Sequence, residues 1–133
     1  MTPMNQKDDS LSPDASFQHL RLSMVGDVAL IEICTKDFQG PRAGKELGYE
    51  LATVLAQDWA RRIVVDFHKT AFMSSSGFAA LFKLVNQANA SRRQLKFCGM
   101  ARGVMTGAAV VGLTKIVEVH DDLAGAMKAF APA

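Results

Sequence analysis

Residues 17 to 34 carry two short runs in which hydrophobic and polar residues roughly alternate, as they do in half-buried β-strands. Gly26 and Asp27 separate the two runs, and such a pair favours a tight turn. We therefore expect the folded domain to open with a β-hairpin. The residues before it, 1–15, are rich in Asp, Ser, Pro and Asn, which predicts a disordered lead.

A helical pattern follows the hairpin. Residues 35–41 are predicted to be a loop that ends in a Gly-Pro pair, and hydrophobic residues then recur every three or four positions to about residue 57. Gly44 and Gly48 weaken this helix by roughly 1 kcal/mol each relative to alanine. We expect close packing of the helix on the sheet to compensate for that loss.

The rest of the chain alternates between strand and helix patterns. Residues 62–67 are β-branched and apolar on both faces, which predicts a central parallel strand. Residues 77 to about 90 have helical spacing, with serines at the N-cap. The remaining predicted elements are a strand at residues 95–98, a helix at 100–112, a strand at 116–119 and a helix from 121 to about 130.

This order of elements predicts an α/β fold in one domain over residues 16–133. Its four- to five-stranded, mostly parallel sheet opens with the β-hairpin and is accompanied by about four helices. Parallel neighbouring strands need right-handed crossovers, which the helices supply. A chain of 133 residues is long enough for one hydrophobic core and too short for two.

The composition narrows the classes of partner and the location. Hydrophobic residues make up 49% of the chain and the net charge is only +2, so we expect no nucleic-acid partner, which would need a basic stripe. The polar N-terminus lacks a signal-peptide core, and the longest apolar stretch, residues 104–113, is shorter than the roughly 20 residues that span a bilayer. We therefore expect no membrane insertion and a cytoplasmic location.

The two cysteines, Cys34 and Cys98, lie far apart in apolar, strand-like runs without metal-ligand spacing. This predicts buried, reduced thiols, which fits a cytoplasmic location. We expect no metal site and no cofactor.

The stretch that carries functional information runs from residue 64 to residue 77. It places Asp66 near the C-terminal end of the central strand, and three serines where the next helix begins. Partners and ligands of open α/β sheets engage this edge, and a helix N-terminus tolerates an added phosphate. Taken alone, three serines before a helix are explained by capping.

The wider pattern resembles the STAS family, and in particular its anti-sigma factor antagonists. Their central signature reads strand, Asp, loop, apolar residue, Asp, Ser, Ser or Thr, Gly, apolar residue. Here it corresponds to Val65 and Asp66, followed by Phe72-Met73-Ser74-Ser75-Ser76-Gly77-Phe78. The resemblance covers residues 17 to 130, with the same element order and a Gly99 turn after the fourth strand.

The resemblance implies a protein-binding switch without catalytic residues. An anti-sigma factor that is itself a serine kinase would phosphorylate Ser75, and a serine phosphatase would reset the switch. The unphosphorylated antagonist would sequester that anti-sigma factor and release the sigma factor. Ser74 stands where the family usually has Asp, which leaves Ser74 and Ser76 as alternative acceptors, and residues 35–44 lack the usual Gly-x-Leu-Asp pattern.

The surface that would bind the partner is expected around the serines. Asp66 has two interpretations: it accepts hydrogen bonds from loop N–H groups, or it helps to position the switch loop at the surface. Met73, Met100 and Met105 form a soft apolar contact patch or fill the core. The complete set of expected partner-binding residues is Asp66, Phe72, Met73, Ser74, Ser76, Gly77 and Met100.

Two other functions compete with this interpretation. The same fold serves as a STAS subunit of a larger signalling particle or of a transporter assembly. A small serine hydrolase is the remote alternative, with Ser75 as nucleophile and His120 beside Asp121 or Asp122 as base. Met73 argues against it, because it occupies the first glycine position of the Gly-x-Ser-x-Gly elbow. We expect no enzymatic activity.

Overall fold

The computed structural model describes residues 17–130, so the predicted disordered lead lies outside the described residues. No helix within them has the length and apolar character to cross a membrane. The elements, in chain order, are β2 (Leu20–Val25), β3 (Val28–Ile33), β4 (Asp37–Phe38), α1 (Gly40–Leu55), β5 (Arg62–Asp66), β6 (Phe72–Met73), α2 (Ser75–Ala90), β7 (Gln94–Cys98), α3 (Arg102–Val110), the 3₁₀ turn η1 (Leu113–Lys115), β8 (Glu118–His120) and α4 (Leu123–Lys128).

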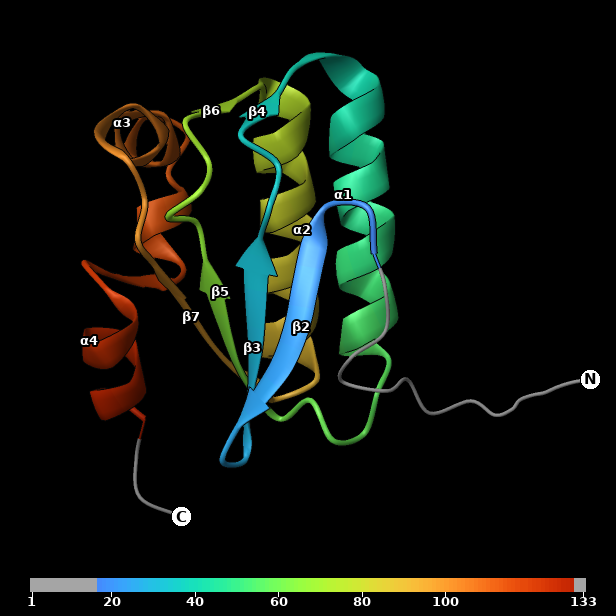
Figure 1. Cartoon of the computed structure of the whole chain (residues 1–133), viewed down its shortest axis with the longest axis vertical. Helices are drawn as coiled ribbons and strands as arrows, with labels where there is room; N and C mark the ends of the chain where they lie inside the picture. Colours follow the sequence, from blue (N-terminus) through green and yellow to red (C-terminus); the bar gives the residue numbers. More distant parts are fainter. Residues whose placement is uncertain (1–16, 131–133) are drawn as a thin grey trace, which may run out of the picture.

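The main sheet has five strands in the order β2-β3-β5-β7-β8, and β5 lies at its centre. Strands β2 and β3 form the predicted antiparallel hairpin, while the other neighbouring strands are parallel. Helices α1 and α2 lie side by side on one face of the sheet, and α4 packs on the other face (Figure 1). The predicted fold class is therefore confirmed.

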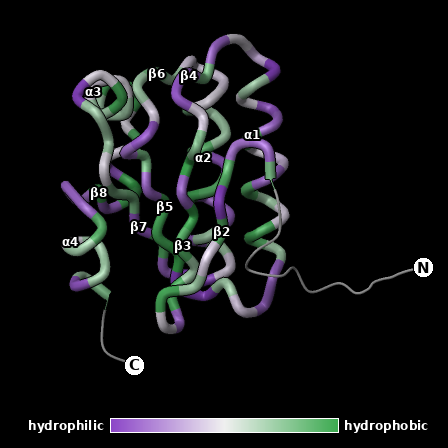
Figure 2. The backbone as a smooth tube through the Cα atoms, in the orientation of Figure 1, coloured by the Kyte–Doolittle hydropathy of each residue, from purple (hydrophilic) through white to green (hydrophobic). Residues whose placement is uncertain are grey.

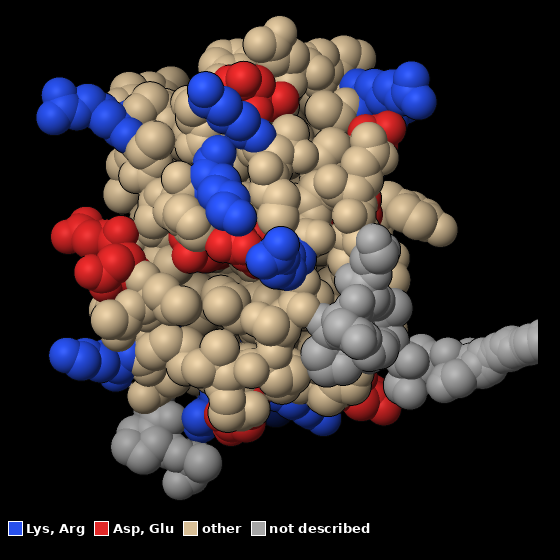
Figure 3. Space-filling view, in the orientation of Figure 1, with Lys and Arg blue, Asp and Glu red and all other residues tan. Residues whose placement is uncertain are grey.

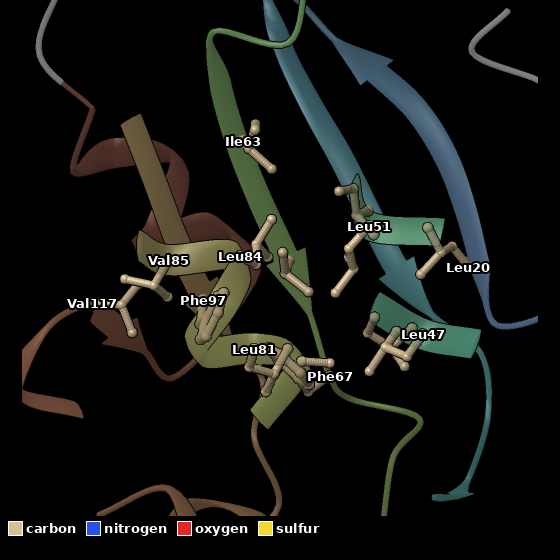
Figure 4. Close-up of a cluster of buried hydrophobic side chains, with 14 of the residues drawn as sticks. Leu20, Leu47, Leu51, Ile63, Phe67, Leu81, Leu84, Val85, Phe97 and Val117 are labelled. Atoms are coloured by element: carbon tan, nitrogen blue, oxygen red, sulfur yellow. The ribbon is translucent and has the colours of Figure 1, made fainter. Parts of the chain in front are cut away.

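The centre of the sheet is hydrophobic because β5 is covered on both faces. Ile63, Val64 and Val65 are each 0% exposed, as expected for a central parallel strand. Figure 2 shows hydrophobic residues along β3 and β5. In Figure 4 the side chain of Ile63 points toward Leu51 of α1 and Leu84 of α2, which belong to the same core.

Several helix and strand bounds differ from the prediction. Helix α1 begins at Gly40, because Pro41 fits the first turn of a helix, where its missing N–H costs nothing. Helix α2 begins two residues earlier than expected, at Ser75. Helix α3 is shorter than predicted because Gly112 adopts a φ of 84°, which only glycine adopts readily, and η1 follows. Strand β8 consequently begins at Glu118.

The prediction that residues 35–41 form a loop is wrong for the two residues that form a short strand. Asp37 and Phe38 form β4, which pairs in parallel with β6 from the segment before the serines. Strands of two residues are too short to produce a recognisable alternation. This small sheet lies with α3 beyond the carboxyl ends of the main parallel strands (Figure 1).

The prediction that the glycines of α1 pack on the sheet is wrong, because they pack on α2. A Cβ atom at Gly44 would lie 2.3 Å from Ser76 Oγ and 2.5 Å from the Ser76 carbonyl carbon. A Cβ atom at Gly48 would lie 3.4 Å from the Ala80 Cβ atom. The absence of a side chain at Gly44 therefore lets the N-terminal half of α1 approach the first turn of α2.

The cysteines differ from each other, and the prediction for Cys34 is wrong. Cys34 comes directly after the end of β3, and its side chain is exposed, whereas that of the preceding residue, Ile33, is fully buried. Cys98 is buried as predicted. Burial, together with the negative charges of Asp66 and Asp122, raises the pKa of the Cys98 thiol to about 12.

We expect only one of the two thiols to react with Ellman's reagent in the native protein at pH 8. Because its pKa is raised to about 12, the Cys98 thiol is almost entirely protonated at that pH, and the side chain is covered. Absorbance should report one thiol per native chain and two after denaturation. The Cys34→Ser variant should give no native signal, and a rapid signal from that variant would contradict the burial of Cys98.

Candidate functional site

The three serines lie where the small sheet meets the start of α2. The backbone N–H of Ser74 donates to the Phe38 carbonyl oxygen at 2.8 Å, which extends the pairing of β6 with β4. Ser74 occupies the N-cap position of α2 as predicted, but its hydroxyl makes no capping hydrogen bond. The capping explanation for the serines is therefore wrong for their side chains.

The hydroxyls of Ser74 and Ser76 are both directed to one backbone oxygen. Ser76 donates to the Gly40 carbonyl oxygen at 2.8 Å, and Ser74 lies 3.4 Å from the same oxygen. The two hydroxyl oxygens are 3.1 Å apart. These contacts tie the first turn of α2 to the first residue of α1.

Ser75 differs from its two neighbours. It is the first residue of α2, its side chain is exposed, and its hydroxyl has no hydrogen-bond partner within residues 17–130. The first turn of α2 contains no acidic residue, and its backbone N–H groups receive no side-chain cap. The positive end of the helix is thus next to an accessible hydroxyl.

Asp66 lies below this surface, at the end of β5, and is 9% exposed. One carboxylate oxygen accepts the backbone N–H of His68 at 3.0 Å, and the other lies 3.0 Å from the His68 ring nitrogen Nδ1. Gly99, which has a φ of 73°, leaves room for this carboxylate, since a Cβ atom there would lie 2.6 Å from Asp66 Oδ1. The first interpretation of Asp66, as an acceptor for loop N–H groups, is the one that the contacts support.

The other expected partner-binding residues divide into exposed and buried ones. Phe72 is 48% exposed beside the serines, an unusual position for a phenylalanine. Met73 is 6% exposed and packs under Gly77, where a Cβ atom would lie 2.5 Å from Met73 Cγ. Met100 is half-buried against the core. Core filling is therefore what the structure shows for Met73, which offers little surface to a partner.

The residues of the hydrolase alternative are not brought together. His120 Nε2 lies 3.0 Å from Glu118 Oε1, and the Asp122 carboxylate accepts the N–H of Gly125 at 2.8 Å. Neither side chain contacts Ser75 in the described part of the chain. Residues 17–130 also contain no cluster of His, Cys, Asp or Glu that could hold a metal ion.

Gly40 is a site residue that sequence reasoning missed. Its carbonyl oxygen orients two of the three serines, and its φ of 74° is in the region that favours glycine. The Gly-Pro pair marked a turn, but nothing in the pattern indicated that this turn contacts residues 34 and 36 positions away.

Charges of both signs lie together on the face shown in Figure 3. Lys69 Nζ is 3.5 Å from Glu32 Oε1, and Arg62 is 3.4 Å from Asp27. The charges of these pairs offset one another, in contrast to the one-signed stripe of a nucleic-acid binder.

Solved structures with the same architecture come from several bacteria. A STAS domain protein from Planctomyces limnophilus described as an anti-sigma-factor antagonist has a TM-score of 0.70 at 14% identity, covering 84% of this chain and 97% of that one. The phosphorylated Bacillus cell fate determinant SpoIIAA has a TM-score of 0.61 at 17% identity, covering 82% and 96%. The STAS domain of a SulP transporter from Vibrio cholerae has a TM-score of 0.62 at 15% identity, covering 80% and 83%.

Structural similarity at such low sequence identity establishes only the fold. The family is shown by a match to the sequence itself. No curated protein matches the chain significantly. The sequence profile of the STAS domain, however, matches residues 35–126, from the loop before β4 into α4. That segment contains the serine turn, Asp66 and both helices that pack against the turn, and it is more than half of the chain. The chain therefore belongs to the STAS domain family.

Proposed function

We propose that this protein is an anti-sigma factor antagonist whose binding is switched by phosphorylation of Ser75. In the unphosphorylated form it sequesters an anti-sigma factor serine kinase in the cytoplasm and so releases a sigma factor. A serine phosphatase removes the phosphate and restores binding. The observation that carries the proposal is the exposed, unpartnered hydroxyl of Ser75 at the N-terminus of α2.

The contacts of the neighbouring serines support Ser75 over the alternatives. A kinase acting on Ser76 would have to break the hydrogen bond from its hydroxyl to Gly40, and would place a phosphate where α1 is closest. Ser74 also lies within reach of the Gly40 oxygen, and its hydroxyl is partly covered. Ser75 can accept a phosphate without disturbing any contact of its side chain.

The proposed contact surface is centred on Ser75 and the exposed ring of Phe72. Ser74 and Ser76 lie at its border. Asp66 and Gly77 contribute indirectly, because Asp66 accepts the backbone N–H of His68 and Gly77 leaves room for the Met73 side chain. An exposed aromatic side chain next to a small hydroxyl is suited to a protein interface, because aromatic residues often contribute much of the binding energy. Met100 lies half-buried at the margin.

Incubation with a candidate anti-sigma factor kinase and ATP tests the proposal. Intact mass should increase by one phosphate, and peptide mapping should locate it on Ser75. The Ser75→Ala variant should gain no phosphate, and a serine phosphatase should reverse the modification of the wild type. Modification of Ser74 or Ser76 with Ser75 unmodified would contradict the assignment.

A role within a transporter assembly or a larger signalling particle is the second candidate, because the fold is shared with the STAS domain of a SulP transporter. The two functions differ in their partners. A pulldown should recover a small kinase-fold protein if the protein is a free antagonist. Recovery of membrane transporter subunits would favour the second function.

A further inference from the structure

We infer that the anti-sigma factor also binds a groove between α1 and α2, and that it fills this groove with an apolar side chain flanked by acidic residues. The inference rests on the proposed function and extends it by naming a second contact on the same partner. The groove has a volume of about 450 Å³ and lies between the outer sides of the two helices.

Small residues form the floor of the groove. Helix α1 contributes Gly44, Gly48 and Ala52, and α2 contributes Ala79 and Ala80. This floor is apolar and has no long side chain to cover it. An exposed concave surface of this kind accommodates a hydrophobic side chain from a partner.

The groove is continuous with the proposed switch. Ser76 is one of the residues that line it. Ser75 and Ala79 are four residues apart on α2 and therefore lie on the same side of the helix, one turn from each other. A partner segment that touches the Ser75 hydroxyl therefore reaches the groove by continuing along α2.

The charges at the groove define the chemistry of its occupant. Lys45 and Lys83 are the charged residues that line it, and neither forms an ion pair within residues 17–130. Two unpaired cations beside an apolar floor complement a segment with acidic groups on either side of an apolar one.

Tyr49 supplies an aromatic anchor at the border of the groove. Its side chain is 79% exposed, whereas tyrosine side chains in folded proteins are usually at least partly buried. Tyrosine is among the residues that most often dominate binding energy at protein interfaces. Lys45, Tyr49 and Lys83 thus surround the apolar floor with two cations and an aromatic ring, which bind acidic and apolar side chains of a partner.

Binding of the purified kinase to four forms of the full chain tests the inference: wild type, Tyr49→Ala, the double variant Lys45→Glu/Lys83→Glu, and the control Lys115→Glu/Lys128→Glu. The control makes the same charge change at η1 and α4, away from the groove. We expect both groove variants to bind at least tenfold more weakly than the wild type, and the control to bind within threefold of it. Thermal melting should show that all four forms fold equally well, since the substituted side chains are exposed.

The salt dependence of affinity provides a second readout that damage to the fold would not change. Wild-type affinity should fall as salt rises from 50 to 500 mM, and the groove double variant should show a flatter dependence. Equal binding by the wild type and both groove variants would overturn the groove while leaving the proposed function intact. Failure of the wild type to bind any kinase would overturn both.

Discussion

Phosphorylation of Ser75 is expected to weaken binding of the anti-sigma factor at least a hundredfold while the melting temperature changes by only a few degrees. The added group carries a charge of about −1.5 to −2 at the N-terminus of α2, where the helix dipole favours an anion and no acidic residue opposes it. We therefore expect phosphorylation to leave the stability of the folded state unchanged. The proposed partner would be matched to a small neutral hydroxyl, so an unpaired phosphate at that interface would cost several kcal/mol.

Two variants separate the effects of charge and of the hydroxyl. Ser75→Asp should also bind weakly, although less so than the phosphorylated protein, because a carboxylate has less charge and a different shape. Ser75→Ala should bind like the unmodified wild type and should not respond to the kinase and ATP. Affinities from calorimetry and melting curves from circular dichroism supply both measurements. Binding at full strength by protein phosphorylated at Ser75 would rule out the mechanism.

The second large effect concerns stability. Leu81→Ala should lower the free energy of unfolding by about 2–5 kcal/mol, the range for emptying a core leucine site. Leu81 is 0% exposed and lies beside Phe67 in the core between α2 and the sheet (Figure 4). Denaturant unfolding followed by circular dichroism measures the change.

Asn86→Ala is the matched control for this experiment, because Asn86 is an exposed residue of the same helix. Its unfolding free energy should stay within about 0.5 kcal/mol of the wild type. If Leu81→Ala changed stability as little as the control, the inward orientation of Leu81 would be wrong.

The elements with long periodic patterns were predictable from the sequence, and the contacts among the loops were not. The β-branched run of β5 and the spacing of Phe78, Leu81 and Val85 in α2 identified a central strand and the helix after it. The predicted burial of Cys34 is wrong because an apolar strand pattern does not show where the strand ends and solvent reaches the chain. Strands β4 and β6 have two residues each, which is too short to show an alternation of hydrophobic and polar residues.

The residue pattern predicted the stretch that contains the site, and only the register with the family motif selected Ser75 within it. Ser74, Ser75 and Ser76 are equivalent in the sequence apart from their register with the family motif. They become distinct only when the chain folds, because Gly40 then lies beside two of them and leaves Ser75 unpartnered. A long-range contact of this kind has no local signal.

The hydrogen bonds from Ser74 and Ser76 to the Gly40 carbonyl oxygen join two distant parts of the chain at the serine turn. The two segments that shape the serine turn are 36 residues apart in the sequence and are brought together by the packing of α1 on α2. The proposed acceptor would therefore be a conformational epitope, and a short linear peptide around Ser75 would lack the segment that contains Gly40. We therefore expect the proposed kinase to phosphorylate the folded protein much faster than a peptide of residues 70–80 or the denatured chain. Recognition by that kinase would then depend on the segment from β4 to Gly40 as well as on the serines themselves.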